Sequence, residues 1–412
     1  MGRIVELNNM EFRISPVRLK YLLDLYKLSN EEFLSKLQGT NKNIVLSLDD
    51  ISQILQDNKK VKLTLLKKMD NIFGKGVNWL ISKRGLPSKE KFSLFFRKDK
   101  FNSRINIGSI RIVEEFERKK DEIEAYCNNI NYKAIKKLNY NLTDDPDFVA
   151  KIIRKKFDET RIKLKKEALL RENNSDRDFL ENLIRIIEEF NVFVFEFTEN
   201  WNKKDKADFN GFFMSPNLIV IKRQQNYFKR EIFTLMHEFA HYLINEEEID
   251  EEVGESLNQG KVENWCNEFA YQFLIADFDN KIKELDEAVS SNGFHKELLE
   301  EISKKTRLST LALYTKLRII NKISAMSYSK IYDEIIDSIN KEIQKKKEAA
   351  ELERQILKEK DQKSFTSSPK PIESNLFKEI LKINYFEGNI SEGQVLESLK
   401  LKNKSINEVI YS

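Results

Sequence analysis

The stretch Phe233–Leu243, FTLMHEFAHYL, carries two of the three histidines of a 412-residue chain. These histidines are four residues apart, so on a helix they share one face, and both imidazoles can reach one metal ion at about 2.0–2.1 Å. Glu238, next to the first histidine, is then placed to take a proton from a water molecule at the metal. The spacing predicts a helix with the metal ligands His237 and His241 and the general base Glu238. The pattern also occurs on ordinary amphipathic helices, and a structural role is the alternative.

A catalytic zinc site needs a third protein ligand, which we expect to follow the helix. Glu263 and Asn267 are four residues apart in a second expected helix, so the carboxylate can bind Zn²⁺ while the amide supports a ligand imidazole from outside the first coordination shell. Two other donors compete with Glu263. The acidic run 246–248 follows the first helix, and Glu268 lies about 140° round the second helix from Glu263. We expect the run to be a solvated loop and Glu268 to face water.

Other reactive side chains have simpler interpretations. His295 follows Asn292-Gly293 in an expected loop, which predicts a surface residue. Cys266 lies beside Trp265 and has no histidine that is not already assigned to the metal, so we expect it to be a packing residue. The sequence leaves open which group would stabilise an oxyanion, and the candidates are Tyr227, Arg230, Tyr242 and Tyr271.

The composition is that of a globular protein with a highly charged surface. Hydrophobic residues make up 40% and charged residues 33%, and no apolar run approaches the roughly 20 residues of a membrane-spanning helix. Two cysteines cannot form a disulfide framework, and no secretion signal is recognisable at the N-terminus. We therefore expect a cytoplasmic protein without membrane contact. The net charge of +4 is too small to indicate nucleic-acid binding by itself.

The N-terminal part, residues 1–90, is predicted to be a domain of short helices. Apolar residues recur at helical spacing from Leu19 to Leu37, from Leu48 to Leu55 and from Leu63 to Phe73, and Gly85-Leu86-Pro87 breaks the pattern. This arrangement is typical of a helix-turn-helix domain and also of any small helical bundle, so DNA binding and protein docking both remain open. Candidate base-reading side chains are Gln53, Gln56, Asn58, Lys59 and Lys60.

The rest of the chain predicts an α+β fold that is mostly helical. Residues 91–190 form a charged helical connector, whose basic clusters Arg154–Lys156 and Lys163–Lys166 we interpret as solvated faces. Val192–Phe197 and Leu218–Ile221 are predicted strands, with Gly211 and Pro216 as breaks between them. The predicted divisions are a core at 191–325, a charged helix and linker at 326–371, and a small helical unit at 372–412.

The two metal-site segments together resemble the ImmA/IrrE family of zinc metallopeptidases. Phe233–His241 is similar to the family's F-T-L-x-H-E-x-x-H, and Glu263–Ala270 is similar to its E-x-x-x-N-x-F-A. Leu63–Pro87 and Phe95–Lys98 are similar to the longer form of the family, which has an N-terminal helix-turn-helix region like that of Xre-type repressors. Where the family often has a proline after the second motif, this chain has Phe273–Asp277 without one.

The resemblance implies a zincin-like core, a small sheet with active-site helices, flanked by the N-terminal helical domain and C-terminal helical units. It also implies an intracellular zinc endopeptidase whose substrate is a DNA-binding repressor or antitoxin in mobile-element, stress or phage-related regulation. Two other functions remain open: a DNA-binding regulator or antitoxin whose metal domain is structural or a sensor, and a scaffold whose charged C-terminal arm recruits a partner. Glu238 argues against both, because a structural site needs no base beside its ligand.

Overall fold

The computed structural model describes residues 11–26, 28–38, 46–82, 106–133, 135–172, 175–199, 206–223, 228–246, 249–251, 260–285, 294–359, 370–401 and 406. The chain divides into two compact units, the first at residues 1–122 with 199–208 and the second at 123–198 with 209–412. The sequence features at Gly39, Gly85–Pro87, Phe95–Lys98 and Asn292-Gly293 lie outside the described residues.

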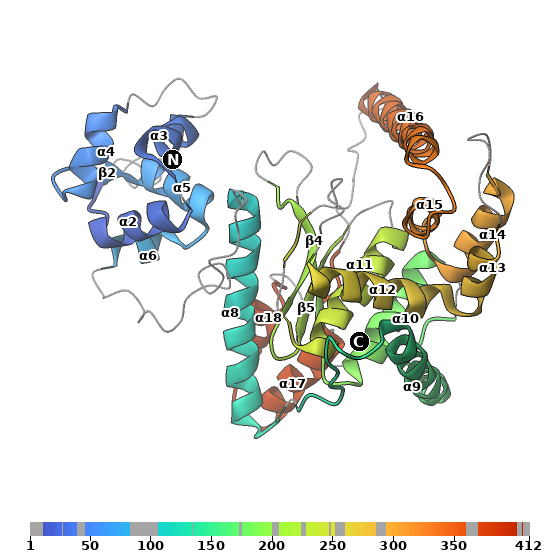
Figure 1. Ribbon diagram of the computed structural model, residues 1–412. Helices are drawn as coiled ribbons and strands as arrows, with labels where there is room; N and C mark the ends of the chain where they lie inside the picture. Colours follow the sequence, from blue (N-terminus) through green and yellow to red (C-terminus); the bar gives the residue numbers. More distant parts are fainter. Residues whose placement is uncertain are drawn as a thin grey trace. The chain divides into compact units, whose positions relative to one another are not determined.

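The described residues of the first unit include five short helices with a core of their own. They are α2 (Pro16–Leu25), α3 (Asn30–Gln38), α4 (Leu48–Leu55), α5 (Leu63–Phe73) and α6 (Val77–Ile81), shown in blue in Figure 1. A two-stranded antiparallel ladder joins β1 (Glu11–Phe12) to β2 (Val61–Lys62). The fully buried side chains of these helices include Leu19, Leu22, Phe33, Ile51, Leu66 and Met69.

Local signals in the sequence account for several ends of these helices. Pro16 begins α2, where a missing backbone N–H costs nothing. Ser47 and Asp50 form a reciprocal capping box at the start of α4. Gly74, with a φ of 68°, ends α5 in the left-handed conformation that glycine adopts without steric cost.

Four of the candidate base-reading side chains, Gln53, Gln56, Asn58 and Lys59, have polar partners within the first unit. Lys59 pairs with Asp50, Gln53 donates to Asp49, and Asn58 donates to Gln56. Gln56 and Lys60 are exposed. DNA binding by this unit stays a prediction. The helix α8 (Ile107–Asn129) follows and ends within the second unit.

The second unit is built on a four-stranded mixed sheet with the order β3-β5-β4-β6. Strand β3 (Phe193–Phe197) runs parallel to β5 (Leu218–Lys222), and β4 (Phe209–Met214) runs antiparallel to both β5 and β6 (Ile249–Glu251). The two predicted strands are confirmed as β3 and β5, and Pro216 lies in the turn before β5. The interpretation of Gly211 as a break was wrong, because Gly211 lies inside β4 and pairs with Ile221.

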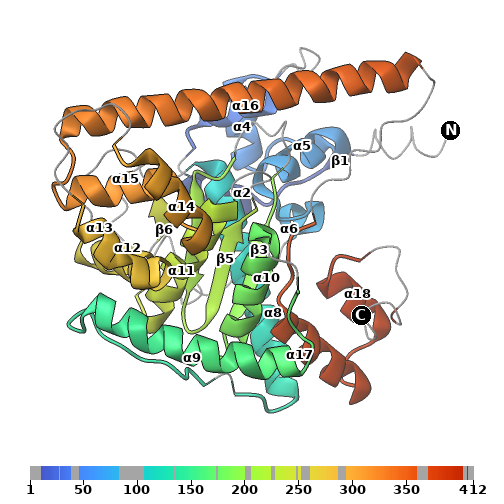
Figure 2. The same ribbon diagram turned by 90° about the vertical axis from the view of Figure 1, so that its right-hand side faces the viewer.

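Three layers of helices build up on one face of this sheet. Helix α11 (Phe228–Ile244) packs on β4 and β5, α12 (Lys261–Ile275) packs on α11, and α9 (Pro146–Lys166) packs on α12, as Figures 1 and 2 show. Helix α10 (Asp176–Glu188) contacts α9, α11 and β3. Residues of α9 and α10 therefore belong to the same hydrophobic core as the metal-site helices.

Arg154 of α9 is not part of a solvated basic face, contrary to the interpretation of its cluster. Its side chain is half-buried and donates hydrogen bonds to the carbonyl oxygens of Gln272 and Phe273, the first of them from Nη2 and the second from Nε at 3.1 Å. These carbonyls lie in the last turn of α12, where the Gln272 carbonyl also accepts from the backbone N–H of Ala276, and a cation there stabilises the helix end. Lys155 and Lys156 are exposed, as expected.

A mainly helical segment follows α12. It comprises the 3₁₀ turn η2 (Ala276–Phe278), α13 (Asp279–Lys283), α14 (Lys296–Thr306), α15 (Thr310–Ile319) and α16 (Ala325–Glu359). A short turn at 307–309 separates α14 from α15, and Ser309 caps α15. The charged stretch after Lys341 continues α16, whose 35 residues span about 52 Å at 1.5 Å per residue.

The C-terminal segment docks on the sheet and on α10 through two buried carboxylates. The Glu188 carboxylate accepts hydrogen bonds from Ser374 Oγ and the Asn375 backbone N–H, both at 2.7 Å. These contacts lie at the start of α17 (Asn375–Phe386), which is followed by α18 (Glu392–Ser398). Burial raises the pKa of Glu188, while the hydrogen bonds from Ser374 and Asn375 oppose the shift.

The second carboxylate, Glu196 of β3, joins this segment to the edge of the sheet. Its backbone N–H donates to the Ile372 carbonyl at 2.9 Å, and its side chain accepts from the Ile372 N–H at 2.8 Å. Arg177 of α10 neutralises the same carboxylate with both of its terminal nitrogens. Ile372 thus pairs with the edge of β3 that does not face β5, while residues 374–376 contact Glu188 of α10.

Within the described ranges, no helix has both the length and the apolar character needed to cross a membrane.

Candidate metal centre

The site lies between α11 and α12, in the interior of the second unit. Almost every residue of α11 from Glu231 to Ile244 is buried, because the helix has the sheet on one side and α12 on the other. His237 is 2% exposed, and His241 and Glu238 are fully buried. Burying polar side chains in this way costs free energy unless they are hydrogen-bonded, paired with an opposite charge or bound to a metal ion.

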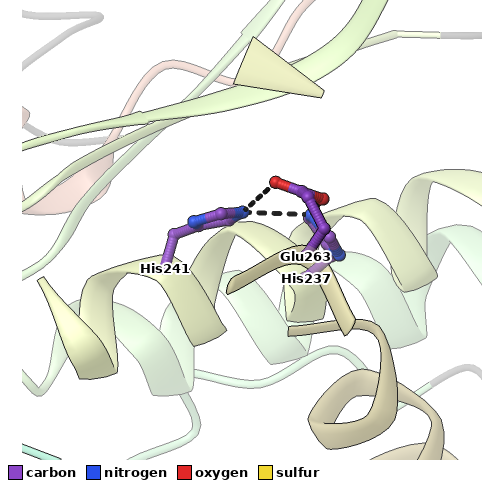
Figure 3. Close-up of side chains that lie close together, drawn as sticks. All are labelled: His237, His241 and Glu263. Carbon is purple, nitrogen blue, oxygen red and sulfur yellow. Dashed lines mark hydrogen bonds and ion pairs between the residues drawn. The ribbon is translucent and has the colours of Figure 1, made fainter. Parts of the chain in front are cut away.

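Figure 3 shows His237 and His241 on one face of α11, turned toward Glu263 of α12. The two Nε2 atoms are 3.1 Å apart. Glu263 Oε2 lies 3.2 Å from His237 Nε2, and Glu263 Oε1 lies 3.3 Å from His241 Nε2. The three side chains predicted as metal ligands are thus brought together.

These separations fit a tetrahedral metal ion. Donor atoms at about 2.0–2.1 Å from a tetrahedral Zn²⁺ are about 3.3 Å from one another. Two imidazole nitrogens and one carboxylate oxygen are also the donor set of many catalytic zinc sites, which keep the fourth position for water or substrate. The residues present therefore fit zinc in both spacing and chemistry.

The protonation states favour metal binding. Burial lowers the pKa of His241 below its ordinary value, so the imidazole is neutral. Burial alone would raise the pKa of Glu263, but the neighbouring His237 and His241 side chains lower it below its usual range, so the carboxylate is ionised. Neutral imidazoles and an ionised carboxylate are the forms that bind a cation.

A backbone carbonyl fixes the orientation of His241. Its Nδ1 lies 2.9 Å from the carbonyl oxygen of Glu246, and because a carbonyl only accepts, Nδ1 carries the proton. The lone pair is then on Nε2, which faces Glu263 and His237. Glu246 of the acidic run thus contributes its backbone, while Glu247 and Glu248 lie outside the described residues.

Strand β4 meets α11 at the turn that carries Glu238. A Cβ atom placed on Gly211 would lie 3.1 Å from Glu238 Cγ and 2.7 Å from Thr234 Cγ2. The strand backbone therefore touches the helix beside the predicted base. The sequence signal was present, since Gly211 stands among aromatic strand residues, but its meaning depends on a contact between distant segments.

The alternative third ligand, Glu268, is committed elsewhere. Both of its oxygens accept from Lys316 Nζ of α15, at 2.7 and 2.8 Å, and Gln272 donates to it at 2.8 Å. The Glu268 side chain is 34% exposed, so it faces water in part, but it is also ion-paired with the buried Lys316 of α15. Asn267 is half-buried on α12, one turn after Glu263, and its role beside a ligand imidazole stays a prediction.

The remaining residues considered in the sequence are Cys266, His295 and the four possible oxyanion donors. Cys266 is fully buried and His295 is exposed at the start of α14, as expected. Among the proposed oxyanion donors, the Tyr242 hydroxyl donates to the Phe190 carbonyl, and the Tyr271 ring is buried below Lys316. Arg230 is exposed, and Tyr227 lies outside the described residues.

Two histidines four apart around a glutamate, joined by a carboxylate from the next helix, define the site class of an HExxH metallopeptidase. Residues 187–317 match the sequence profile of the IrrE N-terminal-like domain, Peptidase_M78. This segment contains β3 to β6, both metal-site helices and α15. Comparisons with curated proteins and with solved structures gave no match. Residues 187–317 therefore form an IrrE N-terminal-like domain, in which His237, His241 and Glu263 are placed so that they could hold a metal ion.

Proposed function

We propose that this protein is a zinc-dependent endopeptidase. The observation that carries the proposal is the cluster of His237, His241 and Glu263. Its two Nε2 atoms are 3.1 Å apart and each lies 3.2–3.3 Å from one of the two Glu263 oxygens, and Glu238 is on the same helix as the histidines. Zinc held there would polarise the scissile carbonyl and lower the pKa of a water molecule.

The roles of the chain's own residues follow from their positions. The Glu238 carboxylate accepts the proton of the attacking water and then delivers it to the leaving amine. The Glu246 carbonyl holds His241 in one tautomer, so that the ring does not have to reorient during the reaction. The buried setting removes competing water from around the reacting groups.

Metal content tests this proposal most directly. We expect about one zinc per chain in protein purified without chelators, measured by inductively coupled plasma mass spectrometry. His237→Ala and Glu263→Ala should each lose most of the metal, because two remaining donors bind it weakly. Glu238→Gln should retain it, because Glu238 is not a ligand in this assignment.

Glu268→Gln is the matched control for Glu263→Ala, since it alters a carboxylate of the same helix that pairs with Lys316. We expect it to keep its zinc. Metal-free wild-type protein, or zinc lost equally from Glu268→Gln and Glu263→Ala, would contradict the ligand assignment.

For the substrate, we propose a specific regulatory protein, a DNA-binding repressor of the Xre type or an antitoxin. The support is the similarity to the ImmA/IrrE family and the presence of a separate helical unit that could hold a partner. Proteases of narrow specificity use remote contacts to place one peptide bond at the metal. We therefore propose little activity toward casein or short generic peptides.

The first unit supplies a second candidate function, DNA binding. Its separate core of short helices favours this, and a regulatory enzyme could use it to find a DNA-bound substrate. If the unit contacts phosphates, affinity for duplex DNA should fall steeply as salt rises, because each contact releases counterions. Lys60→Glu, at an exposed position, should weaken binding and leave zinc content unchanged. Salt-independent or absent binding in a fluorescence-anisotropy titration would favour protein docking instead.

A further inference from the structure

Strand β4 comes closest to α11 where Gly211 lies beside Thr234 and Glu238. Thr234 and Glu238 are four residues apart on α11, so both side chains lie on the helix face that meets the strand. A Cβ on Gly211 would also lie 3.0 Å from the Val220 carbonyl oxygen of the neighbouring strand. The space beside Gly211 is therefore closed on three sides, one of them backbone.

The need for glycine here is one of space rather than of backbone conformation. The φ of Gly211 lies outside the left-handed region that favours glycine, and its pairing with Ile221 is that of an ordinary strand residue. Alanine could adopt this backbone, but its methyl group would have to displace a neighbour. The carbonyl of Val220 belongs to the sheet, so the atoms left to move are those of Thr234 and Glu238.

An irregularity in the sheet coincides with this contact. On the β6 side, Phe209 pairs with Glu251 and Phe212 pairs with Ile249, so β4 has one residue more than β6 between these pairs. Such a bulge bends and twists the strand locally, and bulges often re-aim groups beside active sites. Asn210 and Gly211 lie within it, at the point where the strand touches the base-bearing turn of α11.

We propose that Gly211 is a positioning residue for Glu238. The bare Cα of the strand forms the wall against which Glu238 Cγ rests, and this contact holds the carboxylate beside the open metal position. The three atoms nearest to a Cβ placed on Gly211 belong to Thr234, Val220 and Glu238, so we assign the effect of Gly211 to Glu238 and not to the metal ligands. The inference rests on the proposed function, since it assigns Glu238 as the base.

Gly211→Ala tests this role. We expect kcat for the cleaved partner to fall at least tenfold while KM and zinc content stay near the wild-type values. The visible spectrum of the Co²⁺-substituted protein should be unchanged, because the ligands do not move. Gly393→Ala is the matched control, since a Cβ there meets only Ser391 Oγ at 4.0 Å, and it should behave as wild type. Loss of metal from Gly211→Ala, or an altered cobalt spectrum, would overturn the proposal.

A second variant separates positioning from stability. Thr234→Ser deletes the Cγ2 atom that lies 2.7 Å from the added methyl group and leaves the contact with Glu238. We expect Gly211→Ala alone to lower the thermal stability, because its methyl group meets Thr234. The double variant Gly211→Ala/Thr234→Ser should regain most of that stability and keep the low kcat. If kcat recovers together with stability, Gly211 has a structural role only.

A double-mutant cycle shows whether the effect passes through Glu238. Adding Gly211→Ala to Glu238→Gln should cause no further loss of activity, because the base is already absent. Equal fold losses in the wild-type and Glu238→Gln backgrounds would overturn the proposal.

A second double-mutant cycle measures stability instead of cleavage, so it tests the contact between Gly211 and Glu238 even if the proposed function is wrong. Glu238→Ala removes the Cγ atom that the added methyl group would meet, so Gly211→Ala should lower the urea midpoint less in that background than in wild type. This difference is expected whether or not a substrate is cleaved. Equal shifts in both backgrounds would show that no such contact exists.

Discussion

Glu238→Gln should bind the protein substrate and fail to cut it. The amide keeps the size of the side chain, so the site and the metal ligands are preserved, but it cannot accept the proton of the attacking water. Loss of a general base typically lowers kcat by about 10²-fold or more. The measurement is a cleavage time course with a repressor or antitoxin from the same genetic neighbourhood, together with co-purification of the uncut complex.

The control is Glu246→Gln, at an exposed glutamate that meets the site only through its backbone carbonyl. It should cut at nearly the wild-type rate. If Glu238→Gln cuts as fast as wild type, Glu238 is not the base. If no neighbouring regulator is bound or cut by either protein, the alternatives of a DNA-binding regulator and a scaffold become the leading ones.

Glu188→Ala should produce the largest loss of stability in the second unit, about 3 kcal/mol. The substitution leaves Ser374 Oγ and the backbone N–H groups of Asn375 and Leu376 without their acceptor at a buried helix start. Each buried donor left unsatisfied costs about 1–3 kcal/mol, and water entering the space would recover part of this.

The free energy of unfolding, from urea titration of the metal-loaded protein, measures this effect. Hydrogen exchange should show its largest increase in α17 and along β3. Glu379→Ala, at a side chain of α17 that is 55% exposed, is the control and should change stability by less than about 0.5 kcal/mol. Equal effects at the two positions would mean that the Glu188 contacts do not hold the C-terminal segment.

The metal-site residues could be predicted from sequence because their geometry is mostly local. His237 and His241 share a helix face by spacing alone, and Glu263 stands near the start of the next helix, so the only tertiary requirement is that the two helices pack together. The strands β3 and β5 were predictable for a similar reason, since their apolar runs are bounded by turn residues. Their aromatic and β-branched composition left little ambiguity about their type.

The features that sequence reasoning missed all depend on partners from distant segments. Gly211 looked like a break because its close contact with Thr234 and Glu238 of α11, which leaves no room for a side chain, cannot be seen from the local sequence. Arg154 looked solvated because the carbonyls that it caps belong to α12, and Glu268 looked solvated because Lys316 comes from α15. In each case the residue type was interpreted correctly from the local sequence, but a contact from a distant segment determined how buried the residue is.

The docking of residues 372–376 also sets the order of events during synthesis. The segment that neutralises the β3 edge is translated 176 residues after Glu196 and 186 residues after Glu188. Contacts so far apart in the chain are slow to form, because closing the intervening loop costs entropy before any contact compensates for it. A nascent chain that already carries all three metal ligands therefore still has an open sheet edge and two carboxylates without these partners. Ile372 follows Glu263 by about 110 residues in the sequence, so we expect these contacts of the second unit to form late in synthesis.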